Sequence, residues 1–187
     1  MLKKVLIANR GEIACRVIRA CRELGVSSVA VYSEADRESL HAKIADEAIC
    51  VGAGSNGDSY LNLANILMAC RITGAEAVHP GYGYFSERAG FAAALSSLGI
   101  AFIGPPVEAI ESMGDKASAK AAAVAANCPV VPGSDGIVET EADALEVAAQ
   151  IGYPVLLKAV AGGGGRGIRR VNSPEELPPA TALSRTG

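Results

Sequence analysis

Over the first hundred residues, short apolar runs alternate with longer segments in which apolar residues recur every three or four positions. The apolar runs have the length and composition of buried strands, and they occupy residues 3–8, 28–32, 47–51, 75–79 and 100–103. Helical spacing occurs at 13–24, 61–73 and 86–98, and a short helix is predicted at 40–44. Strands that alternate with helices in this way predict an α/β domain with a doubly wound, mainly parallel sheet, similar to a Rossmann fold.

The first helix has recognisable start and stop signals. Asn9 is placed to cap it, and Glu12 stands three residues later, as in a capping box. Gly25 is expected to end the helix. The residues predicted to form its buried face are Ile13, Ala14, Val17, Ile18, Cys21 and Leu24.

The pattern changes after residue 106. Two helices are predicted at 107–113 and 115–126, the second rich in alanine, and residues 129–136 are rich in turn formers. A helix at 141–150, strands at 153–158 and 167–171 and a helix start at 172–176 follow. We therefore expect an α/β domain at 1–106, linker helices at 107–128 and a partial second domain at 129–187.

A glycine-rich segment lies between the last two predicted strands. Glycines occupy positions 162–165, and Gly167 follows Arg166. Glycine buries no side chain, so such a run suits a backbone that lies against a ligand with exposed N–H groups. The nearby cations Lys158, Arg166, Arg169 and Arg170 favour a phosphate ligand. The run predicts a mobile phosphate-binding lid, and the alternative is a flexible surface linker.

Composition excludes several classes of protein. Half of the residues are hydrophobic, and the net charge is −3, which does not favour a nucleic-acid partner. No apolar run is long enough for a membrane span, and the four apolar residues before Asn9 are too few for a signal peptide. A membrane partner is therefore not expected either.

Cysteine and histidine content bears on location and metals. The five cysteines never occur as C-x-x-C, so we expect buried free thiols in a reducing cytosol. With only His41 and His79 available, a zinc site is not expected.

Two familiar glycine motifs can be dismissed. Residues 52–57 match G-x-G-x-x-G, but they follow the third predicted strand and no helix opens on the last glycine, which argues against a nicotinamide-dependent Rossmann enzyme. No G-K-[ST] sequence occurs, so a Walker loop is absent as well.

Several segments together resemble one family, the biotin carboxylases. They are Ile7-Ala-Asn-Arg-Gly-Glu-Ile13, His79-Pro-Gly-Tyr-Gly83, Phe102-Ile-Gly-Pro105, Met113-Gly-Asp-Lys116, Val131-Pro-Gly-Ser134, and Lys158 with the glycine loop. The resemblance runs from residue 1 to about residue 176. It implies the N-terminal domain of the family, the linker helices and the first part of an ATP-grasp domain. The family carboxylates biotin on a partner protein, with MgATP and bicarbonate, through carboxyphosphate.

The resemblance implies roles for particular residues in ATP binding. Lys116, Lys158, Gly164, Gly165 and Arg166 match the family's nucleotide-contacting positions. Lys158 ends a strand beside the glycine loop, where its ammonium can reach phosphate oxygens. The alternative for each lysine and for Arg166 is an ordinary solvated cation.

Two further sets of residues are implied. Tyr82 and Glu87 match positions near the bicarbonate and biotin pocket, whereas His79 is interpreted as a structural turn residue. The family's dimer surface matches Arg16, Arg19 and Glu23, for which the alternative is a solvated helix face.

The resemblance also bears on partners and on activity. It implies a subunit of acetyl-CoA carboxylase, and hence fatty acid biosynthesis, or of a related enzyme. The full-length form would be a homodimer that works with a biotin carboxyl carrier protein and a carboxyltransferase. The tail after residue 176 does not resemble the family, so we expect a chain truncated before the magnesium ligands, the general base and the catalytic arginine. No residue of this chain is assigned as catalytic or as a metal ligand, and the alternative function is a non-catalytic fragment that binds nucleotide or a full-length partner.

Overall fold

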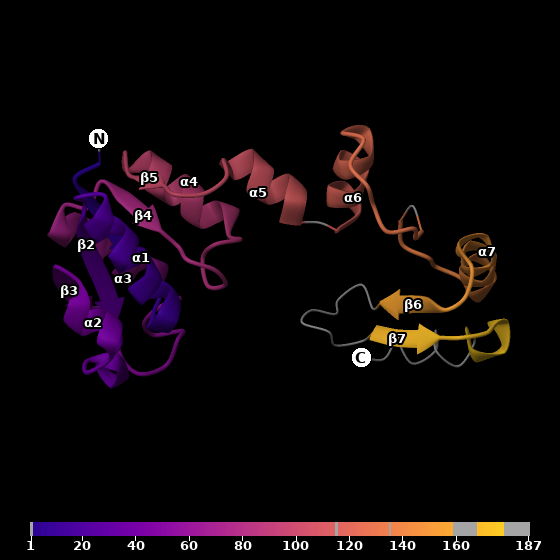
Figure 1. Ribbon diagram of the computed structural model, residues 1–187, viewed down its shortest axis with the longest axis horizontal. Helices are drawn as coiled ribbons and strands as arrows, with labels where there is room; N and C mark the ends of the chain where they lie inside the picture. Colours follow the sequence, from indigo (N-terminus) through magenta and orange to yellow (C-terminus); the bar gives the residue numbers. More distant parts are fainter. Residues whose placement is uncertain (1, 115, 135, 159–167, 178–187) are drawn as a thin grey trace. The chain divides into compact units, whose positions relative to one another are not determined.

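The computed structural model describes residues 2–114, 116–134, 136–158 and 168–177. The chain forms two compact units, Met1–Asp115 and Lys116–Gly187 (Figure 1). The division between them lies inside the segment 107–128 that was predicted to be a linker.

The first unit is built on a five-stranded sheet in the order β3-β2-β1-β4-β5, and every neighbouring pair of strands is parallel. The strands are β1 (Lys4–Ile7), β2 (Ser27–Tyr32), β3 (Glu47–Cys50), β4 (Ala77–His79) and β5 (Ala101–Phe102). The chain adds β2 and β3 on one side of β1, and then β4 and β5 on the other. The predicted doubly wound parallel sheet is confirmed.

Helices cover both faces of this sheet. They are α1 (Gly11–Glu23), α2 (Leu40–Ile44), α3 (Leu63–Thr73) and α4 (Ala89–Ser97), with a 3-10 turn, η1, at Glu34–Asp36. A further helix, α5 (Val107–Gly114), packs beside α4 (Figure 1). On one face α3 and α4 pack against strand residues such as Leu6, Val29 and Val78. On the other, α1 packs against their neighbours in sequence, such as Val5 and Ala30. Because successive strand residues point to opposite faces, strands buried on both faces are continuously apolar.

The start of α1 differs from the prediction. Its N-cap is Arg10, and no side chain caps the helix. The side chains of Asn9 and Glu12 bond elsewhere, as described below, so the predicted capping box is wrong. Leu24, predicted to lie on the buried face, lies just beyond the helix end and is 74% exposed. The rest of the apolar face does lie against the sheet.

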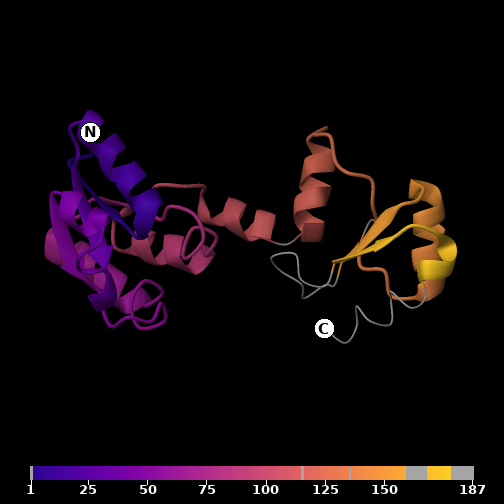
Figure 2. The same ribbon diagram turned by 60° about the horizontal axis from the view of Figure 1, so that its bottom comes forward.

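The second unit is smaller and has a simpler core. Its elements are α6 (Lys116–Ala125), α7 (Glu141–Ile151), β6 (Val155–Lys158), β7 (Ile168–Val171) and a 3-10 turn, η2, at Pro174–Glu176. β6 and β7 pair antiparallel, with Lys158 opposite Ile168, and lie beside α7 (Figures 1 and 2). The buried residues of this cluster are Ala144, Ala148, Val171 and Leu177.

Only part of the prediction for the cysteines holds. Cys15, Cys21 and Cys70 are buried, but Cys50 and Cys128 are exposed, and all five are free thiols. Cys50 lies on β3, one of the two edge strands of the sheet, where one side of the strand has no neighbouring strand. Among the described residues, no helix is long and apolar enough to cross a membrane.

Candidate functional site

The best-organised polar groups of the first unit lie at the carboxyl ends of β1 and β4. These two strands are neighbours in the sheet, and the direction in which strands are added reverses between them. In open α/β sheets, ligands bind outside the carboxyl ends of the strands at such a switch point. Two segments leave the sheet here, residues 9–11 after β1 and residues 80–83 after β4.

Asn9 joins these two segments. Its side chain is only 4% exposed. Nδ2 donates to the carbonyl oxygens of Pro80 and Tyr82, each at 2.8 Å. Oδ1 accepts a hydrogen bond from the backbone N–H of Arg10 at 2.9 Å. One buried amide therefore ties the loop after β4 to the start of α1.

His79 and Gly81 shape the same loop from within. Gly81 has a φ of +66°, a conformation that side chains disfavour. A Cβ atom there would also lie 2.7 Å from Nδ2 of Asn9. The Gly81 N–H donates to Nδ1 of His79 at 2.9 Å, and burial lowers the pKa of His79. A neutral His79 that accepts this bond holds the turn, as the sequence indicated for a structural residue.

Tyr82 and Glu87 both lie in the segment between β4 and α4. The Tyr82 side chain is 61% exposed, and its hydroxyl donates to the carboxylate of Glu12 in the first turn of α1. This hydrogen bond raises the pKa of Tyr82. Glu87 is exposed in the turn before α4. Both side chains are thus accessible in the segment that follows the carboxyl end of β4.

A second polar cluster connects α1 to the end of β2. Its centre is Asp36. Oδ2 of Asp36 accepts hydrogen bonds from Nη1 of Arg10 at 2.6 Å and from the hydroxyl of Tyr60 at 2.7 Å. Burial opposes ionisation of Asp36, but the hydrogen bonds from Tyr60 and Arg10 outweigh it and leave the pKa of Asp36 below its ordinary value. Burial, together with Asp36, raises the pKa of Tyr60 to about 12. Both groups therefore keep one protonation state over the neutral range.

Aromatic contacts carry this cluster toward the loop that holds Tyr82. The guanidinium of Arg10 lies over the Tyr60 ring, 5.5 Å from its centroid. Tyr60 in turn stacks on Tyr84, with centroids 5.7 Å apart. Sequence reasoning missed Asp36 and Tyr60, because their partners lie far away in the chain and no short motif joins them.

The predicted ATP-binding residues are described only in part. Lys158 is the last residue of β6 and is exposed. Lys116 is the first residue of α6, but its side chain lies outside the part of the chain that the structure describes. Gly164, Gly165, Arg166 and the predicted lid fall in 159–167, also outside the described residues. Arg169 and Arg170 are exposed on β7.

A lysine that the sequence did not single out organises the segment after α6. Nζ of Lys120 donates to the carbonyl oxygens of Gly133 and Ser134, at 2.8 and 2.7 Å. These two residues end the Val131-Pro-Gly-Ser134 motif. Lys120 therefore holds the Val131–Ser134 motif against α6, the helix to which Lys120 belongs.

The residues proposed for a dimer surface lie together on α1. Arg16, Arg19 and Glu23 are exposed, and the helix buries a different set of residues against the sheet. They form a charged, accessible helix face. Neighbouring Arg22 is used within the unit, since Nη2 donates to the carbonyl of Ile44 at 2.9 Å.

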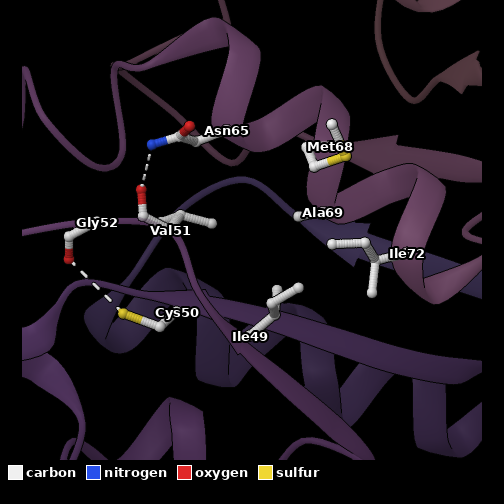
Figure 3. Close-up of a pocket in the computed structure, with 8 residues that line it drawn as sticks. All are labelled: Ile49, Cys50, Val51, Gly52, Asn65, Met68, Ala69 and Ile72. Carbon is white, nitrogen blue, oxygen red and sulfur yellow. Dashed lines mark hydrogen bonds between the residues drawn. The ribbon is translucent and has the colours of Figure 1, made fainter.

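The first unit also has a pocket of about 220 Å³ where β3 ends beside α3 (Figure 3). Apolar side chains such as Ile49, Met68 and Ile72 line it, and Cys50 is its only ionisable group. Gly52 in its wall begins the G-x-G-x-x-G match. A Cβ atom at Gly52 would lie 2.0 Å from the carbonyl oxygen of Asp58, so this glycine lets the loop close on itself.

His41 is buried beneath the Asp36 cluster. Its Nε2 lies 3.2 Å from the carbonyl oxygen of Val31, and burial lowers its pKa. Among the described residues, no group of three or more His, Cys, Asp or Glu side chains is arranged to hold a metal ion.

Two protein-family models match the chain. The family described as "Biotin carboxylase, N-terminal domain" matches residues 1–110. The family described as "Carbamoyl-phosphate synthase L chain, ATP binding domain" matches residues 115–186. The expectation that similarity ends at about residue 176 is therefore wrong, because the second match includes nearly all of the tail.

Named relatives agree with these matches. The chain is 53% identical to biotin carboxylase 1 of Bacillus subtilis, over 95% of this chain and 39% of the relative. It is 52% identical to biotin carboxylase of Pseudomonas aeruginosa, over 100% of this chain and 42% of the relative. The chain thus spans about two fifths of the length of these relatives.

Solved structures give the same answer. The complex of Campylobacter jejuni biotin carboxylase with β-γ-ATP superposes with a TM-score of 0.90 at 46% identity, over 100% of this chain and 42% of that one. The biotin carboxylase domain dimer of Hydrogenobacter thermophilus 2-oxoglutarate carboxylase, in complex with MgADP, ADP and bicarbonate, gives 0.87 at 52% identity, over 100% and 41%. Sequence, fold and the polar switch point agree, and the chain belongs to the biotin carboxylase family.

Proposed function

We propose that this chain is part of an enzyme that carboxylates biotin on a carrier protein, using MgATP and bicarbonate, by way of carboxyphosphate. The observation that carries the proposal is the identity of 53% to a biotin carboxylase, which extends over 95% of the chain and so through both units. The two family models together span residues 1–110 and 115–186, so the similarity is not confined to one unit.

Each unit has its own part in this reaction. In the first unit, Tyr82 and Glu87 border the bicarbonate and biotin pocket, at the sheet edge where α/β proteins bind ligands. In the second, Lys158 and Arg166 neutralise phosphate charge, while Gly164 and Gly165 contribute backbone N–H groups. Lys116 adds a further cation at the start of α6, where a helix N-terminus already favours anions.

Magnesium is the part of the reaction that the described residues do not fit. Mg²⁺ prefers one or two carboxylates beside the substrate phosphates, yet Glu175 and Glu176 are the only acidic residues after Lys158. Glu176 is already used, since its carboxylate accepts hydrogen bonds from the backbone N–H and side chain of Asn172 at 2.8 and 3.1 Å. We therefore assign the metal ligands to the part of the full-length relatives that this chain does not span.

A polypeptide of these 187 residues alone is expected to bind nucleotide weakly and not to turn over. It has phosphate-holding cations, but the described residues offer no metal clamp and no clear proton acceptor beside them. The alternative function, binding of nucleotide or of a full-length partner without catalysis, describes the same polypeptide in isolation.

The partners follow from the proposed activity. They are a biotin carboxyl carrier protein, a carboxyltransferase, and a second carboxylase subunit bound through the α1 face of Arg16, Arg19 and Glu23. The dimer of the Hydrogenobacter thermophilus domain supports a second carboxylase subunit, and the α1 face is our assignment for its contact surface. Five free thiols suit a reducing, cytoplasmic setting.

A chimaeric enzyme tests the proposal. The segment of Bacillus subtilis biotin carboxylase 1 that matches this chain is replaced by the corresponding segment of this chain, and bicarbonate-dependent ATP hydrolysis is measured with free biotin. The chimaera is expected to hydrolyse ATP at a rate within about tenfold of the unmodified enzyme, because the two segments are 53% identical over 95% of this chain. A soluble, folded chimaera with no bicarbonate-dependent hydrolysis would contradict the proposed function.

A further inference from the structure

We propose that Asn9 is a positioning residue for Tyr82: its side chain fixes the backbone of the loop after β4, so that the Tyr82 ring stands at the substrate pocket with its hydroxyl on Glu12. The proposal rests on the proposed function for the role of Tyr82. It assigns to Asn9 a task that neither the helix-capping pattern nor the matching motifs indicate.

The bonds of Asn9 use both ends of its amide. Nδ2 donates both of its hydrogens to loop carbonyls, those of Pro80 and Tyr82. Oδ1 accepts a hydrogen bond from the N–H of Arg10. This bond identifies the oxygen of the amide and so sets the orientation of the group. The group is buried, so water does not compete for these bonds. No other side chain of this size supplies two donors and one acceptor in that arrangement.

The loop is complementary to this amide. Gly81 lies between the two carbonyls that Asn9 binds, and its missing Cβ leaves the space that Nδ2 occupies. The N–H of Gly81 is bound in turn by His79. Three successive residues of the loop are thus held by their backbone groups, and Tyr82 is the last of them.

Tyr82 itself depends on this support. Its ring is mostly exposed, so packing contributes little to its orientation. Among the described residues, the side chain that bonds to its hydroxyl is that of Glu12. Glu12 belongs to α1, which begins two residues after Asn9. Asn9 therefore sets the distance between the backbone of Tyr82 and the carboxylate that receives its hydroxyl.

The experiment observes Tyr82 directly. The 187-residue protein, which has five tyrosines, is labelled with 3-fluorotyrosine, and each fluorine signal is followed by NMR during a pH titration. The Tyr82 signal is assigned as the one lost in Tyr82→Phe. In the unmodified protein its pKa should exceed that of free fluorotyrosine, since the hydroxyl donates to Glu12.

Asn9→Ala should move the chemical shift of the Tyr82 fluorine toward that of an unrestrained fluorotyrosine. It should also lower the pKa of Tyr82 toward that of free fluorotyrosine. Asn9→Asp should do the same at neutral pH, because a carboxylate cannot donate to the two carbonyls. Glu12→Gln should lower the Tyr82 pKa while the loop stays in place. The matched control is Asn65→Ala, which removes a different amide donor, bonded to the Val51 carbonyl at 2.8 Å, and should leave the Tyr82 signal unchanged.

A folded Asn9→Ala protein with an unchanged Tyr82 signal and titration would overturn the proposal. If Asn9→Ala unfolds, Gly81→Ala replaces it, because the added Cβ strains the same contact from the loop. An unchanged Tyr82 signal in that variant would be equally decisive against the proposal. None of these readouts requires substrate, so they are independent of the chimaera: an inactive chimaera beside the expected fluorine shifts would refute the proposed function alone.

Discussion

The sheet of the first unit and the hairpin of the second present their functional side chains in different ways. In β2 the residues Val29, Ala30 and Val31 are all fully buried, because helices cover both faces of the sheet. In the hairpin, Val155 and Leu157 pack with α7, whereas Leu156 between them is 58% exposed. The first unit therefore has apolar cores on both faces of its sheet, whereas the second unit has a core on one face of its hairpin only.

This difference determines how firmly each site is held. Tyr82 extends from a loop whose backbone is bound by the buried Asn9, whereas Lys158 ends a two-stranded hairpin supported by a single helix. A hairpin of two strands is marginally stable by itself and depends on such support. We therefore expect Tyr82, which we propose to border the substrate pocket, to be held more firmly than Lys158, which we propose to bind phosphate from a less stable element.

The largest expected effect is on core stability. Ile66→Ala in α3 should lower the free energy of unfolding of the first unit by about 2–5 kcal/mol, the usual cost of such a truncation in a packed core. Leu156→Ala, on the exposed face of the hairpin, should change stability by no more than about 0.5 kcal/mol. Amide hydrogen exchange, measured at increasing urea concentrations, gives the free energy of unfolding of each unit separately. Similar losses from the two changes would contradict the comparison.

Next in size is the effect on nucleotide binding. Lys158→Ala should weaken ATP binding by about 1.5–3 kcal/mol, the range for a hydrogen bond to a charged group, and should leave the melting temperature nearly unchanged. Calorimetric titration measures the affinity. The control is Lys43→Ala, which removes an exposed lysine that pairs with Glu38. If the Lys158 variant bound ATP as tightly as the control, Lys158 would not belong to the site.

Two tyrosines provide a matched pair, one in each unit. Tyr60→Phe removes a buried hydroxyl that donates to Asp36 and accepts the N–H of Ser33, and should cost about 1–3 kcal/mol of stability. The buried hydroxyl of Tyr153 has no hydrogen-bond partner among the described residues, so Tyr153→Phe should be neutral or stabilising. Thermal denaturation compares the two variants. The comparison would fail if Tyr153→Phe proved to be the more damaging change.

The smallest expected effect concerns pH. Burial lowers the pKa of both His41 and His79, and the sequence has no other histidine. The unfolded chain therefore binds more protons than the folded one as pH falls through the unfolded value of about 6.5. The first unit should be fully stable near pH 8 and lose stability toward about pH 5. His41→Gln should flatten this dependence in denaturant titrations at several pH values, and an unaltered slope would exclude His41 as its source.

The elements of the fold could be predicted because most of them, such as β1, β2, α1 and α3, bury an apolar run or face that the sequence displays directly. The strands and helices of the first unit were found at or close to their positions by this means alone. The start of α1 shows where such reasoning fails. Asn9 and Glu12 fit a capping box, a pattern defined within four residues, but Nδ2 of Asn9 and the carboxylate of Glu12 bond to the loop around Tyr82, far along the chain.

The polar clusters could not be predicted for the same reason. Asp36 combines Arg10 and Tyr60 because parallel strands bring the ends of β1 and β2 to one edge. Nothing in the local sequence marks these three residues as partners. The exposed Leu24 and Cys50 show the converse case, since an apolar residue at the end of a helix or on an edge strand need not be buried.

The most direct test of the account is bicarbonate-dependent ATP hydrolysis by the purified 187-residue chain with free biotin. Charge on the transferred phosphoryl group is normally neutralised by magnesium, and we have proposed phosphate-binding cations for this chain but no carboxylate clamp among its described residues. We predict hydrolysis no faster than in a control carrying Lys116→Ala and Lys158→Ala. Turnover clearly above that control would contradict the claim that the chain holds substrates while its catalytic groups lie elsewhere in the full-length enzyme.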